Sequence, residues 1–367
     1  MKSFLERSFK HRLSDYVTAI AWSPLGNLLA AAAGGGEVQL VMPSKAGFKY
    51  KPLCPATDQS VDVLAFSSDG KWLAMAGQAG QVSLWQVDAE TVHHADTLEC
   101  GSAWIDRLQW HPTYPWLAFN QGKQVQIWDA ERAESVTLLT LPAHVQALGW
   151  SPDGGHFAVS AQKCVYIWDT QQLAKPLYQW ELASASRLLS WSPEGAYLAS
   201  INQDSTVGVL TLAKAEHLQQ LSESLASGEL TLNQSDLPTW MRGFPGKIRQ
   251  IAWAKKADGT ESPMFAVATR ELLALWQLSP DSGWQNWILD IHNDNVLDVA
   301  FQPNTDLLAS ASVDGWVILW KGATEVAQIL DGAKTGFSCI AWHPTGEHLA
   351  AGGQQGEVII WTTYREA

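Results

Sequence analysis

The feature that most constrains the fold of this chain is an internal repeat that runs from one end to the other. Aromatic anchors recur at steps of 44, 44, 40, 41, 62, 48 and 41 residues, and a proline follows most of them within two residues. The anchors are Trp22, Phe66, Trp110, Trp150, Trp191, Trp253, Phe301 and Trp342. Such a period is typical of folds in which one small structural unit is copied and stacked.

Two further markers keep their distance from each anchor. An apolar residue followed by alanine lies eight residues after seven of the anchors, and thirteen after the sixth, which places a five-residue insertion around Lys255 to Ser262. A third marker, usually Trp, comes ten or eleven residues beyond the alanine. The repeat therefore predicts eight units, with cores at about 17–41, 61–85, 105–128, 145–168, 186–210, 248–276, 296–320 and 337–361.

The pattern within each unit indicates short strands separated by turns. In the seventh unit the first strand is bulky, whereas the second carries small residues such as Ala309 and Ala311. Small side chains let neighbouring sheets approach near an axis, and the aromatic residue that ends the third strand fills the wider space further out. This taper is typical of twisted sheets stacked radially.

Each sheet needs a fourth strand, and the spacers between the first seven units contain apolar candidates. The eighth unit ends six residues after Trp361 and leaves no room for one. The N-terminal stretch Ser3 to Phe9 is apolar enough to take that place. We therefore expect the chain start to add the outer strand of the last sheet and to close the structure, which protects strand edges from aggregation.

At this point the residues resemble the WD40 repeat family over essentially the whole chain. The dipeptide that names the family is present as Trp128-Asp129 and Trp168-Asp169, and residues 292–320 look like a full consensus repeat. The other repeats are degenerate in a way typical of a bacterial-type member. The resemblance implies an all-β fold, a single closed WD40-type β-propeller over residues 1–367. Family members commonly have seven blades, but the count here favours eight four-stranded blades, with seven as the alternative because unit six is the most degenerate.

Three residues of unit seven, His292, Ser310 and Asp314, are the residue types of a hydrolase triad. No Gly-x-Ser-x-Gly turn surrounds Ser310, however. The resemblance implies instead that the three residues form a structural hydrogen-bond network with the third-strand Trp320. We therefore expect a structural tetrad and no catalytic residue.

Other polar motifs predict neither a metal nor a cofactor. His93 and His94 lie near Asp96, but adjacent residues of a strand point to opposite faces. The glycine clusters at 34–36 and 352–353 lack the Lys-Ser/Thr ending of a phosphate-binding loop. The docking signature of the Trp-rich quinoprotein propellers does not recur. His111 and His343, which precede prolines, are interpreted as surface turn residues.

The resemblance also indicates where partners would bind, because the starts of the first strands build the entrance around a propeller axis. Asp62 and Asp106 fall in blades two and three, while Arg187, Lys247 and Arg249 fall in blades five and six. We expect an acidic arc beside Trp104 and Tyr16, facing a basic arc across the axis; the alternative is a set of ordinary polar loop tips. The predicted partner-binding rim consists of Tyr16, Asp62, Trp104, Asp106, His144, Arg187, Lys247 and Arg249.

The segment 214–246, between units five and six, is longer than the other connections. Leu218, Leu221 and Leu225 recur in it at helical spacing and suggest a short amphipathic helix. Two readings stay open: a segment that packs on its own propeller, or an element that binds a partner.

Composition limits the function. With 24 Lys+Arg against 37 Asp+Glu, the net charge of −13 argues against a general nucleic-acid binder, which would need a basic surface large enough to overcome that charge. No apolar run approaches the roughly 18–20 residues of a membrane helix, and the widely spaced Cys54, Cys100, Cys164 and Cys339 suit reduced thiols in the cytoplasm. We expect a non-catalytic protein–protein interaction scaffold, a monomeric propeller within a complex, without cofactor or membrane insertion. The alternative is a propeller enzyme or ligand-binding protein that uses the axial channel.

Overall fold

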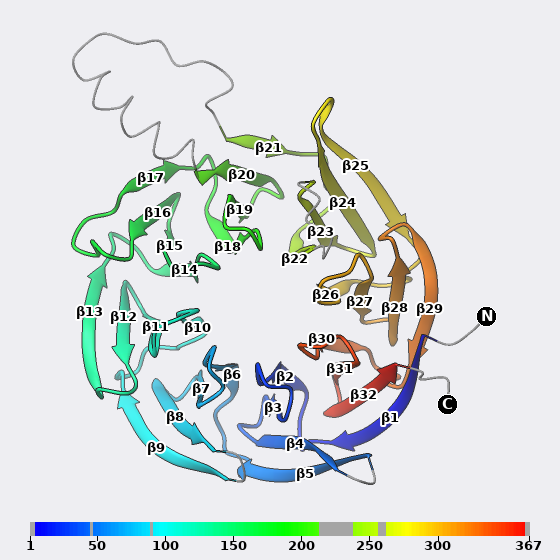
Figure 1. Ribbon diagram of the computed structural model, residues 1–367, viewed down its shortest axis with the longest axis horizontal. Helices are drawn as coiled ribbons and strands as arrows, with labels where there is room; N and C mark the ends of the chain where they lie inside the picture. Colours follow the sequence, from blue (N-terminus) through cyan, green and yellow to red (C-terminus); the bar gives the residue numbers. More distant parts are fainter. Residues whose placement is uncertain (1–3, 45–46, 89–90, 213–237, 256–261, 364–367) are drawn as a thin grey trace. The chain divides into compact units, whose positions relative to one another are not determined.

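The computed structural model describes residues 4–44, 47–88, 91–212, 238–255 and 262–363. These residues form strands β1 to β32, which assemble into eight four-stranded sheets (Figure 1). The prediction of an all-β chain with eight blades is confirmed, and the seven-blade alternative is wrong. By internal contacts the chain divides into two compact units, Met1–Leu108 with Arg249–Ala367, and Gln109–Ile248. Each unit is described by itself.

The first unit holds blades 1, 2, 6, 7 and 8. Blade 1 consists of β2 (Val17–Trp22), β3 (Leu29–Ala33), β4 (Val38–Ser44) and β5 (Gly47–Cys54). Blade 2 consists of β6 (Val61–Phe66), β7 (Trp72–Gly77), β8 (Gln81–Val87) and β9 (Val92–Glu99). Blade 6, whose first strand begins one residue before this unit, consists of β22 (Ile248–Trp253), β23 (Met264–Thr269), β24 (Leu272–Ser279) and β25 (Gly283–Asp290).

The last two blades of this unit come from the end of the chain, together with its start. Blade 7 consists of β26 (Val296–Phe301), β27 (Leu308–Ser312), β28 (Trp316–Lys321) and β29 (Glu325–Asp331). Blade 8 consists of β30 (Phe337–Trp342), β31 (His348–Gly353), β32 (Glu357–Thr363) and β1 (Leu5–Arg12).

The second unit holds blades 3, 4 and 5. Blade 3, whose first strand begins one residue before this unit, consists of β10 (Leu108–Trp110), β11 (Trp116–Gln121), β12 (Gln124–Asp129) and β13 (Glu134–Thr140). Blade 4 consists of β14 (Val145–Trp150), β15 (His156–Ala161), β16 (Cys164–Asp169) and β17 (Tyr178–Glu181). Blade 5 consists of β18 (Ser186–Trp191), β19 (Tyr197–Asn202), β20 (Val207–Thr211) and β21 (Thr239–Met241).

The chain start completes blade 8, as the sequence predicts. Strand β1 pairs antiparallel with β32, from Leu5 opposite Thr363 to Arg12 opposite Glu357. It ends three residues beyond the expected stretch, which stopped at Phe9. Both ends of the chain therefore share one sheet, the blue and red strands that lie side by side in Figure 1.

A glutamine of blade 7 holds the same strand from a second side. The side-chain oxygen of Gln328, on β29, accepts the N–H groups of Phe4 (2.8 Å) and Leu5 (2.9 Å), and its amide nitrogen donates to the carbonyl of Leu5 (2.8 Å). Leu5 is buried in an apolar cluster with Trp361 of β32. The closing strand is thus fixed to its own blade by backbone pairing and to blade 7 by a side chain.

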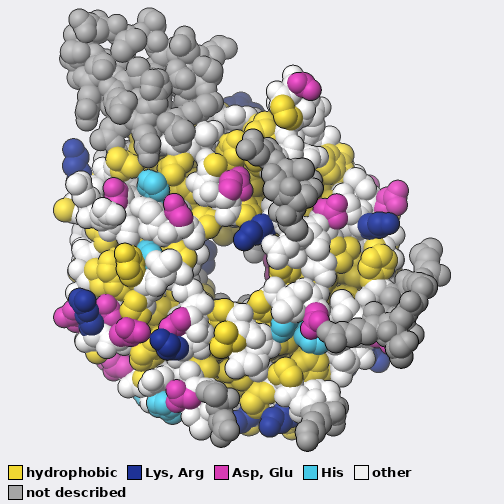
Figure 2. All heavy atoms as spheres, in the orientation of Figure 1, with side chains coloured by type: hydrophobic (Ala, Val, Ile, Leu, Met, Phe, Trp, Pro, Cys, Tyr) yellow, Lys and Arg dark blue, Asp and Glu magenta, His cyan; other side chains and the backbone are white. Residues whose placement is uncertain are grey.

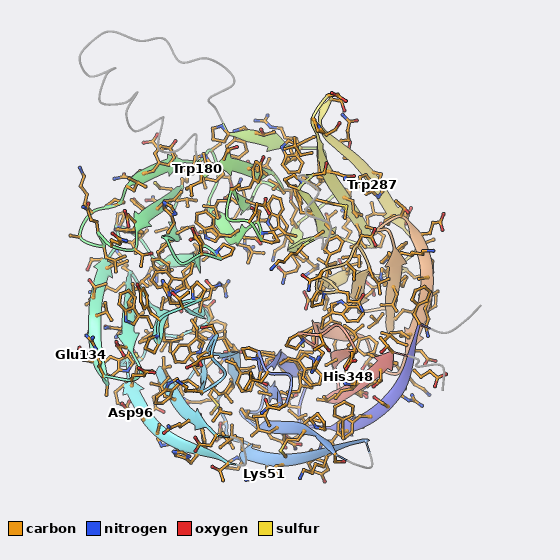
Figure 3. The ribbon with its side chains drawn as sticks, in the orientation of Figure 1. Lys51, Asp96, Glu134, Trp180, Trp287 and His348 are labelled. Carbon is orange, nitrogen blue, oxygen red and sulfur yellow. The ribbon has the colours of Figure 1, made fainter. Side chains whose placement is uncertain are left out.

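The aromatic anchors of the repeat join neighbouring blades. The indole N–H of Trp22 donates to the carbonyl of Ala341 in blade 8, and Trp342 of blade 8 donates to Ala300 in blade 7, both at 3.1 Å. Trp287 lies on the outer strand β25 of blade 6 (Figure 3). Its indole N–H donates in the same way to the carbonyl of Ala323 in blade 7 at 2.9 Å. Since buried N–H groups need partners, these bonds give Trp22, Trp287 and Trp342 a role that Phe could not fill.

The interpretation of His111 and His343 as surface turn residues is wrong. They are only 1% and 7% exposed. Nε2 of His343 donates to the carbonyl of Gly26 in blade 1 at 3.0 Å, while its Nδ1 accepts the N–H of Thr345 at 3.1 Å. Gly26 has φ of +71°, and a Cβ there would lie 2.0 Å from Nε2 of His343, so the turn must be glycine for the histidine to reach it.

Two other junctions repeat this contact. Nε2 of His111 donates to Gly154 of blade 4 at 3.1 Å, and Nε2 of Gln302 in blade 7 donates to Gly346 of blade 8 at 2.8 Å. We call His111, Gln302 and His343 the latch residues. In each case a side chain after the first strand binds the turn glycine of the next blade.

Some expectations fall outside the described residues. The helix expected at Leu218, Leu221 and Leu225 is among them, as is most of the insertion in blade 6, residues 256–261. The first strand of blade 3 begins at Leu108, three residues later than the predicted core. No helix in the described ranges is both long enough and apolar enough to cross a bilayer.

Candidate interaction surface

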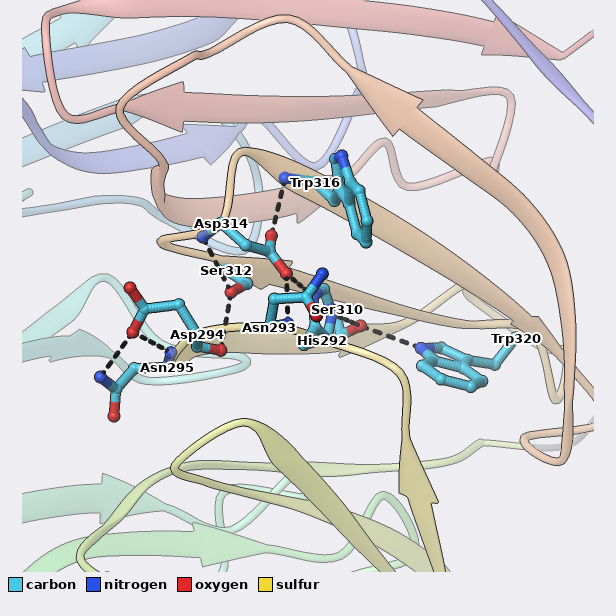
Figure 4. A network of polar contacts seen from close by, with 9 residues as sticks. All are labelled: His292, Asn293, Asp294, Asn295, Ser310, Ser312, Asp314, Trp316 and Trp320. Carbon is cyan, nitrogen blue, oxygen red and sulfur yellow. Dashed lines mark hydrogen bonds and ion pairs between the residues drawn. The ribbon is translucent and has the colours of Figure 1, made fainter.

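Blade 7 brings together the four residues expected to form the tetrad (Figure 4). The indole N–H of Trp320 donates to Oγ of Ser310 at 2.9 Å. The ring of His292 lies between Oγ of Ser310 and Oδ2 of Asp314, at 2.8 Å from each. Because the carboxylate accepts from Nδ1, Nε2 of the neutral ring accepts the hydroxyl proton of Ser310.

Burial decides the charge state of this histidine. His292 is 4% exposed and Ser310 is fully buried. Burial lowers the pKa of His292 below its ordinary value, and the neighbouring carboxylate of Asp314 opposes that shift only in part. The imidazole is therefore neutral at pH 7, and the hydroxyl lies where no substrate reaches it while the blade is closed.

Other blades replace the network with apolar residues. Four residues before the first strand, where blade 7 has His292, lie the buried Leu13, Leu141, Leu182 and Ala333. Where blade 7 has Ser310, blades 1 and 4 carry the apolar Ala31 and Val159, whereas blade 5 keeps a serine, Ser200. Within the described residues, the indole nitrogens of Trp85, Trp128 and Trp276, at the position of Trp320, are buried without a hydrogen-bond partner.

The most exposed aromatic residue of the predicted rim is Trp104, in the loop between β9 and β10. Its side chain is 55% exposed, yet its indole N–H donates to Oδ2 of Asp62 at 2.8 Å. The same oxygen accepts the hydroxyl of the buried Ser60 at 2.8 Å. The structure thus brings two predicted rim residues together, and the hydrogen bonds hold the indole in one orientation although most of it faces solvent.

Tyr16 is the second exposed aromatic residue of the rim, at 46% exposure. Its ring lies against Gly34 so closely that a Cβ there would come within 2.3 Å of a ring carbon. Because Gly34 has no Cβ, the tyrosine ring can approach the β3–β4 turn this closely.

The remaining rim residues differ in their surroundings. Asp106 forms an ion pair with the adjacent Arg107 at 3.0 Å, and Arg249 donates to Asn295 at 3.2 Å. His144, Arg187 and Lys247 are exposed and belong to the second unit. Asp62, Asp106 and Arg249 belong to the first unit, whereas Arg187 and Lys247 belong to the second. The expected opposition of two arcs across an axis therefore stays a prediction.

The alternative of an enzyme that uses the axial channel needs reactive ionisable groups. Two ionisable groups, Asp298 and Cys339, lie on the first strands of blades 7 and 8. Both carboxylate oxygens of Asp298 accept backbone N–H groups, from Val299 at 2.9 Å and Ile340 of blade 8 at 2.8 Å. Burial, the largest cause, raises the pKa of Asp298 to about 6 and that of Cys339 to about 12. The carboxylate is used to join two blades, and the thiol is neutral at pH 7, so neither suits a nucleophile.

His93 and His94 do not converge on a common point. His94 stacks edge-on against Trp85 and contacts Thr97 at 2.8 Å, whereas His93 lies 3.7 Å from Asp88. In the part of the chain that the structure describes, no three His, Cys, Asp or Glu side chains are grouped to hold a metal. On the face shown in Figure 2, acidic, basic and apolar side chains are interspersed within each unit.

The sequence model of the family "WD domain, G-beta repeat" matches residues 4–40, 52–86, 135–169, 283–321 and 324–362, together half of the chain. The chain belongs to the WD40 repeat family. The matched segments include the tetrad of blade 7 and the first-strand anchors of blades 1, 2, 4, 7 and 8.

Two of the curated relatives are distant in sequence but are matched over most of their own length. The chain is 24% identical to protein transport protein sec13 of Aspergillus fumigatus, over 66% of this chain and 86% of the relative. It is 23% identical to the human angio-associated migratory cell protein, over 92% of this chain and 77% of the relative.

Solved structures resemble the chain over almost its full length. The crystal structure of Sqt1 from Chaetomium thermophilum superimposes with a TM-score of 0.77 over 98% of this chain and all of the other, at 16% identity. Saccharomyces cerevisiae Sqt1 gives the same score at 17% identity. At this level of identity the likeness shows the fold, an eight-bladed β-propeller.

Proposed function

We propose that this WD40 propeller is a non-catalytic scaffold that binds partner proteins through the rim at the starts of its first strands. The observation that carries the proposal is the pair of exposed aromatic residues there, Trp104 and Tyr16, each held in place by a neighbouring residue. Aromatic side chains bury much area at little cost in conformational entropy. A rigid sheet scaffold that presents them therefore loses little freedom when a partner docks.

The proposal fits what is known of similar chains. One relative is named as a protein of protein transport, which is a statement about that relative and supports, for this chain, a role among other proteins. Because one fold hosts many functions, the partner has to be sought at the site and not from the likeness.

The same proposal assigns the tetrad a structural role. The hydroxyl of Ser310 is buried and bonded on both sides, and the neutral Cys339 lacks the thiolate that a nucleophile needs. We infer that His292, Asp314, Ser310 and Trp320 stabilise blade 7, and that the eight blades act as one domain.

Three further properties belong to this proposal. Cys54, Cys100, Cys164 and Cys339 are free thiols, which suits the reducing cytoplasm. The net charge of −13 opposes binding of nucleic acid. We expect a monomeric propeller that joins a complex with other proteins.

The test is affinity purification of the full chain from its native cell, with mass spectrometry of what is retained. A variant carrying Trp104→Ala and Arg187→Glu should lose partners that the unaltered chain retains. The matched control is Leu25→Ala, which removes an exposed apolar side chain from the β2–β3 turn instead. If the rim variant retains the same partners as the control, the rim is not the recognition surface.

A further inference from the structure

The proposed rim contains a pair of residues whose geometry selects the chemistry of its partner. Trp104 and Asp62 are joined through the indole N–H and Oδ2 at 2.8 Å, and Ser60 donates to that same oxygen. Within the described residues Oδ1 of Asp62 receives no hydrogen bond. A carboxylate oxygen with acceptor capacity therefore lies beside an indole that is 55% exposed.

An indole face and a carboxylate placed together attract the same kind of group. The π-system of Trp binds ammonium and guanidinium groups over its face, and a carboxylate oxygen accepts their N–H groups. The hydrogen bond from Trp104 fixes the angle between the two groups in advance, so a cation meets both without further ordering of either side chain.

The charges on the surrounding loops favour the same partner. On the blade 1 and blade 2 loops at residues 13–16, 34–37, 55–60 and 78–80, every charged residue is a carboxylate: Asp15, Glu37 and Asp58. The cation nearest in sequence to Trp104 is Arg107, which forms an ion pair with Asp106 at 3.0 Å. A negative field without a competing cation in these loops steers positively charged segments toward the site.

We propose that the Trp104–Asp62 pair binds a Lys or Arg side chain of an exposed, positively charged segment of a partner protein. The cation lies over the indole face and donates to Oδ1 of Asp62. This inference rests on the proposed scaffold function and specifies its partner.

The test measures binding of fluorescein-labelled decapeptides to the purified full chain by fluorescence anisotropy. The probes are an alternating Gly-Arg peptide, an alternating Gly-Lys peptide and an alternating Gly-Glu peptide. Trp104→Leu removes the π face but keeps apolar bulk, and Asp62→Asn removes the charge but keeps an acceptor for the indole. We expect each substitution to weaken binding of the cationic peptides about tenfold. The double variant should be little weaker than either single one, because both groups bind the same cation.

The control variant is Glu325→Gln, which makes the same charge change on outer strand β29 of the same unit. It should stay within about twofold of the unaltered chain if general electrostatic attraction is small. Four outcomes would each overturn the proposal. Two concern the variants: an equal loss of affinity in Asp62→Asn and Glu325→Gln, or unchanged affinity in Trp104→Leu. Two concern the peptides: binding of the glutamate peptide as tight as that of the cationic ones, or no binding of either cationic peptide. Retention of native partners in cell extracts despite these results would leave the scaffold function standing, whereas failure to retain any partner would count against both.

Discussion

At the scale of single residues, histidine and glutamine side chains make the same contact between neighbouring blades. His111 and Gln302 occupy equivalent positions after the first strands of blades 3 and 7, and each donates to the turn glycine of the next blade. The histidine also accepts the backbone N–H groups of Thr113 and Tyr114 at Nδ1. If Nδ1 were protonated, its N–H group would face the two backbone N–H groups that it now accepts. Only the neutral imidazole ring is therefore compatible with this contact.

This requirement makes one junction sensitive to pH. Burial is the main cause that lowers the pKa of His111, so the unfolded chain, with a histidine pKa near 6.5, binds the proton more readily. The stabilisation is therefore fully present above that pH and is lost as the pH falls below it. In His111→Gln, the free energy of unfolding at pH 8 should drop by about 1 kcal/mol or less, and its fall between pH 7.5 and 5 should be smaller than in the unaltered chain.

Urea unfolding at several pH values measures this difference. The matched control is His144→Gln, which makes the same substitution at an exposed histidine outside the latch residues. The buried His292 is present in every variant and contributes the same background. Parallel pH profiles for His111→Gln and His144→Gln would show that the latch does not titrate.

The tetrad gives a second residue-scale prediction. Ser310→Ala leaves Nε2 of His292 and the indole N–H of Trp320 buried without partners, and should lower the free energy of unfolding by about 2–3 kcal/mol. Adding His292→Leu copies blade 1, which has Leu13 and Ala31 at the two positions. Since Asp314 still accepts the N–H groups of Asn293 and Trp316, the double variant should be at least as stable as the single one. Chemical denaturation measures the free energy of unfolding of both variants. A lower value for the double variant than for Ser310→Ala alone would contradict this account.

Which residue contacts could be predicted from the sequence depends on how local their cause is. The tetrad follows from a repeat consensus within one blade, and its four residues could be named. The latch contact of His343 could not, because its partner Gly26 is 317 residues away and the local pattern reads only as a turn before proline. Similarly, the spacing of Ser60 and Asp62 gives no sign that an indole 42 residues later completes the cluster.

At the scale of elements, the closing strand β1 is held by more than its backbone hydrogen bonds to β32. The apolar character of the N-terminal stretch and the missing fourth strand of the last unit were enough to assign β1 to blade 8. They were not enough to predict the hydrogen bonds from Gln328 on β29. The repeat also predicted the eight blades. The length of β21 in blade 5 could not be predicted, because a long connection without the repeat pattern separates it from β20 in the sequence. Strands whose apolar spacing is regular are predictable; strands that follow an insertion are not.

Gln328→Ala tests the contribution of that side chain. It removes three hydrogen bonds to Phe4 and Leu5 and should lower the free energy of unfolding by about 1–2 kcal/mol. Hydrogen–deuterium exchange of residues 5–12 should become faster, because the strand frays from its first residues. Gln285→Ala, on the exposed face of β25, serves as control and should leave that exchange unchanged. Equal protection in both variants would mean that pairing with β32 alone holds the strand.

At the scale of the whole molecule, the sharing of blade 8 by both ends of the chain has a consequence for assembly. Without β1, strand β32 would expose a row of backbone donors and acceptors from Glu357 to Thr363, and such an edge pairs readily with other chains. Removal of residues 1–12 should therefore lower Tm by about 5 °C or more and produce oligomers in size-exclusion chromatography with light scattering.

A permuted chain separates the missing pairing from other effects of the deletion. Strands β28 and β29 of blade 7 run antiparallel and are joined by Gly322-Ala323-Thr324. The same three residues placed after Thr363, followed by residues 4–12, should let the transferred strand fold back on β32 in its native direction. Because the blade is then built from one continuous segment, as blades 1 to 7 are, we expect a monomer with Tm restored to within about 3 °C of the unaltered chain. A monomeric deletion variant, or a permuted chain that still forms oligomers, would show that the edge of β32 is not what keeps the protein from assembling.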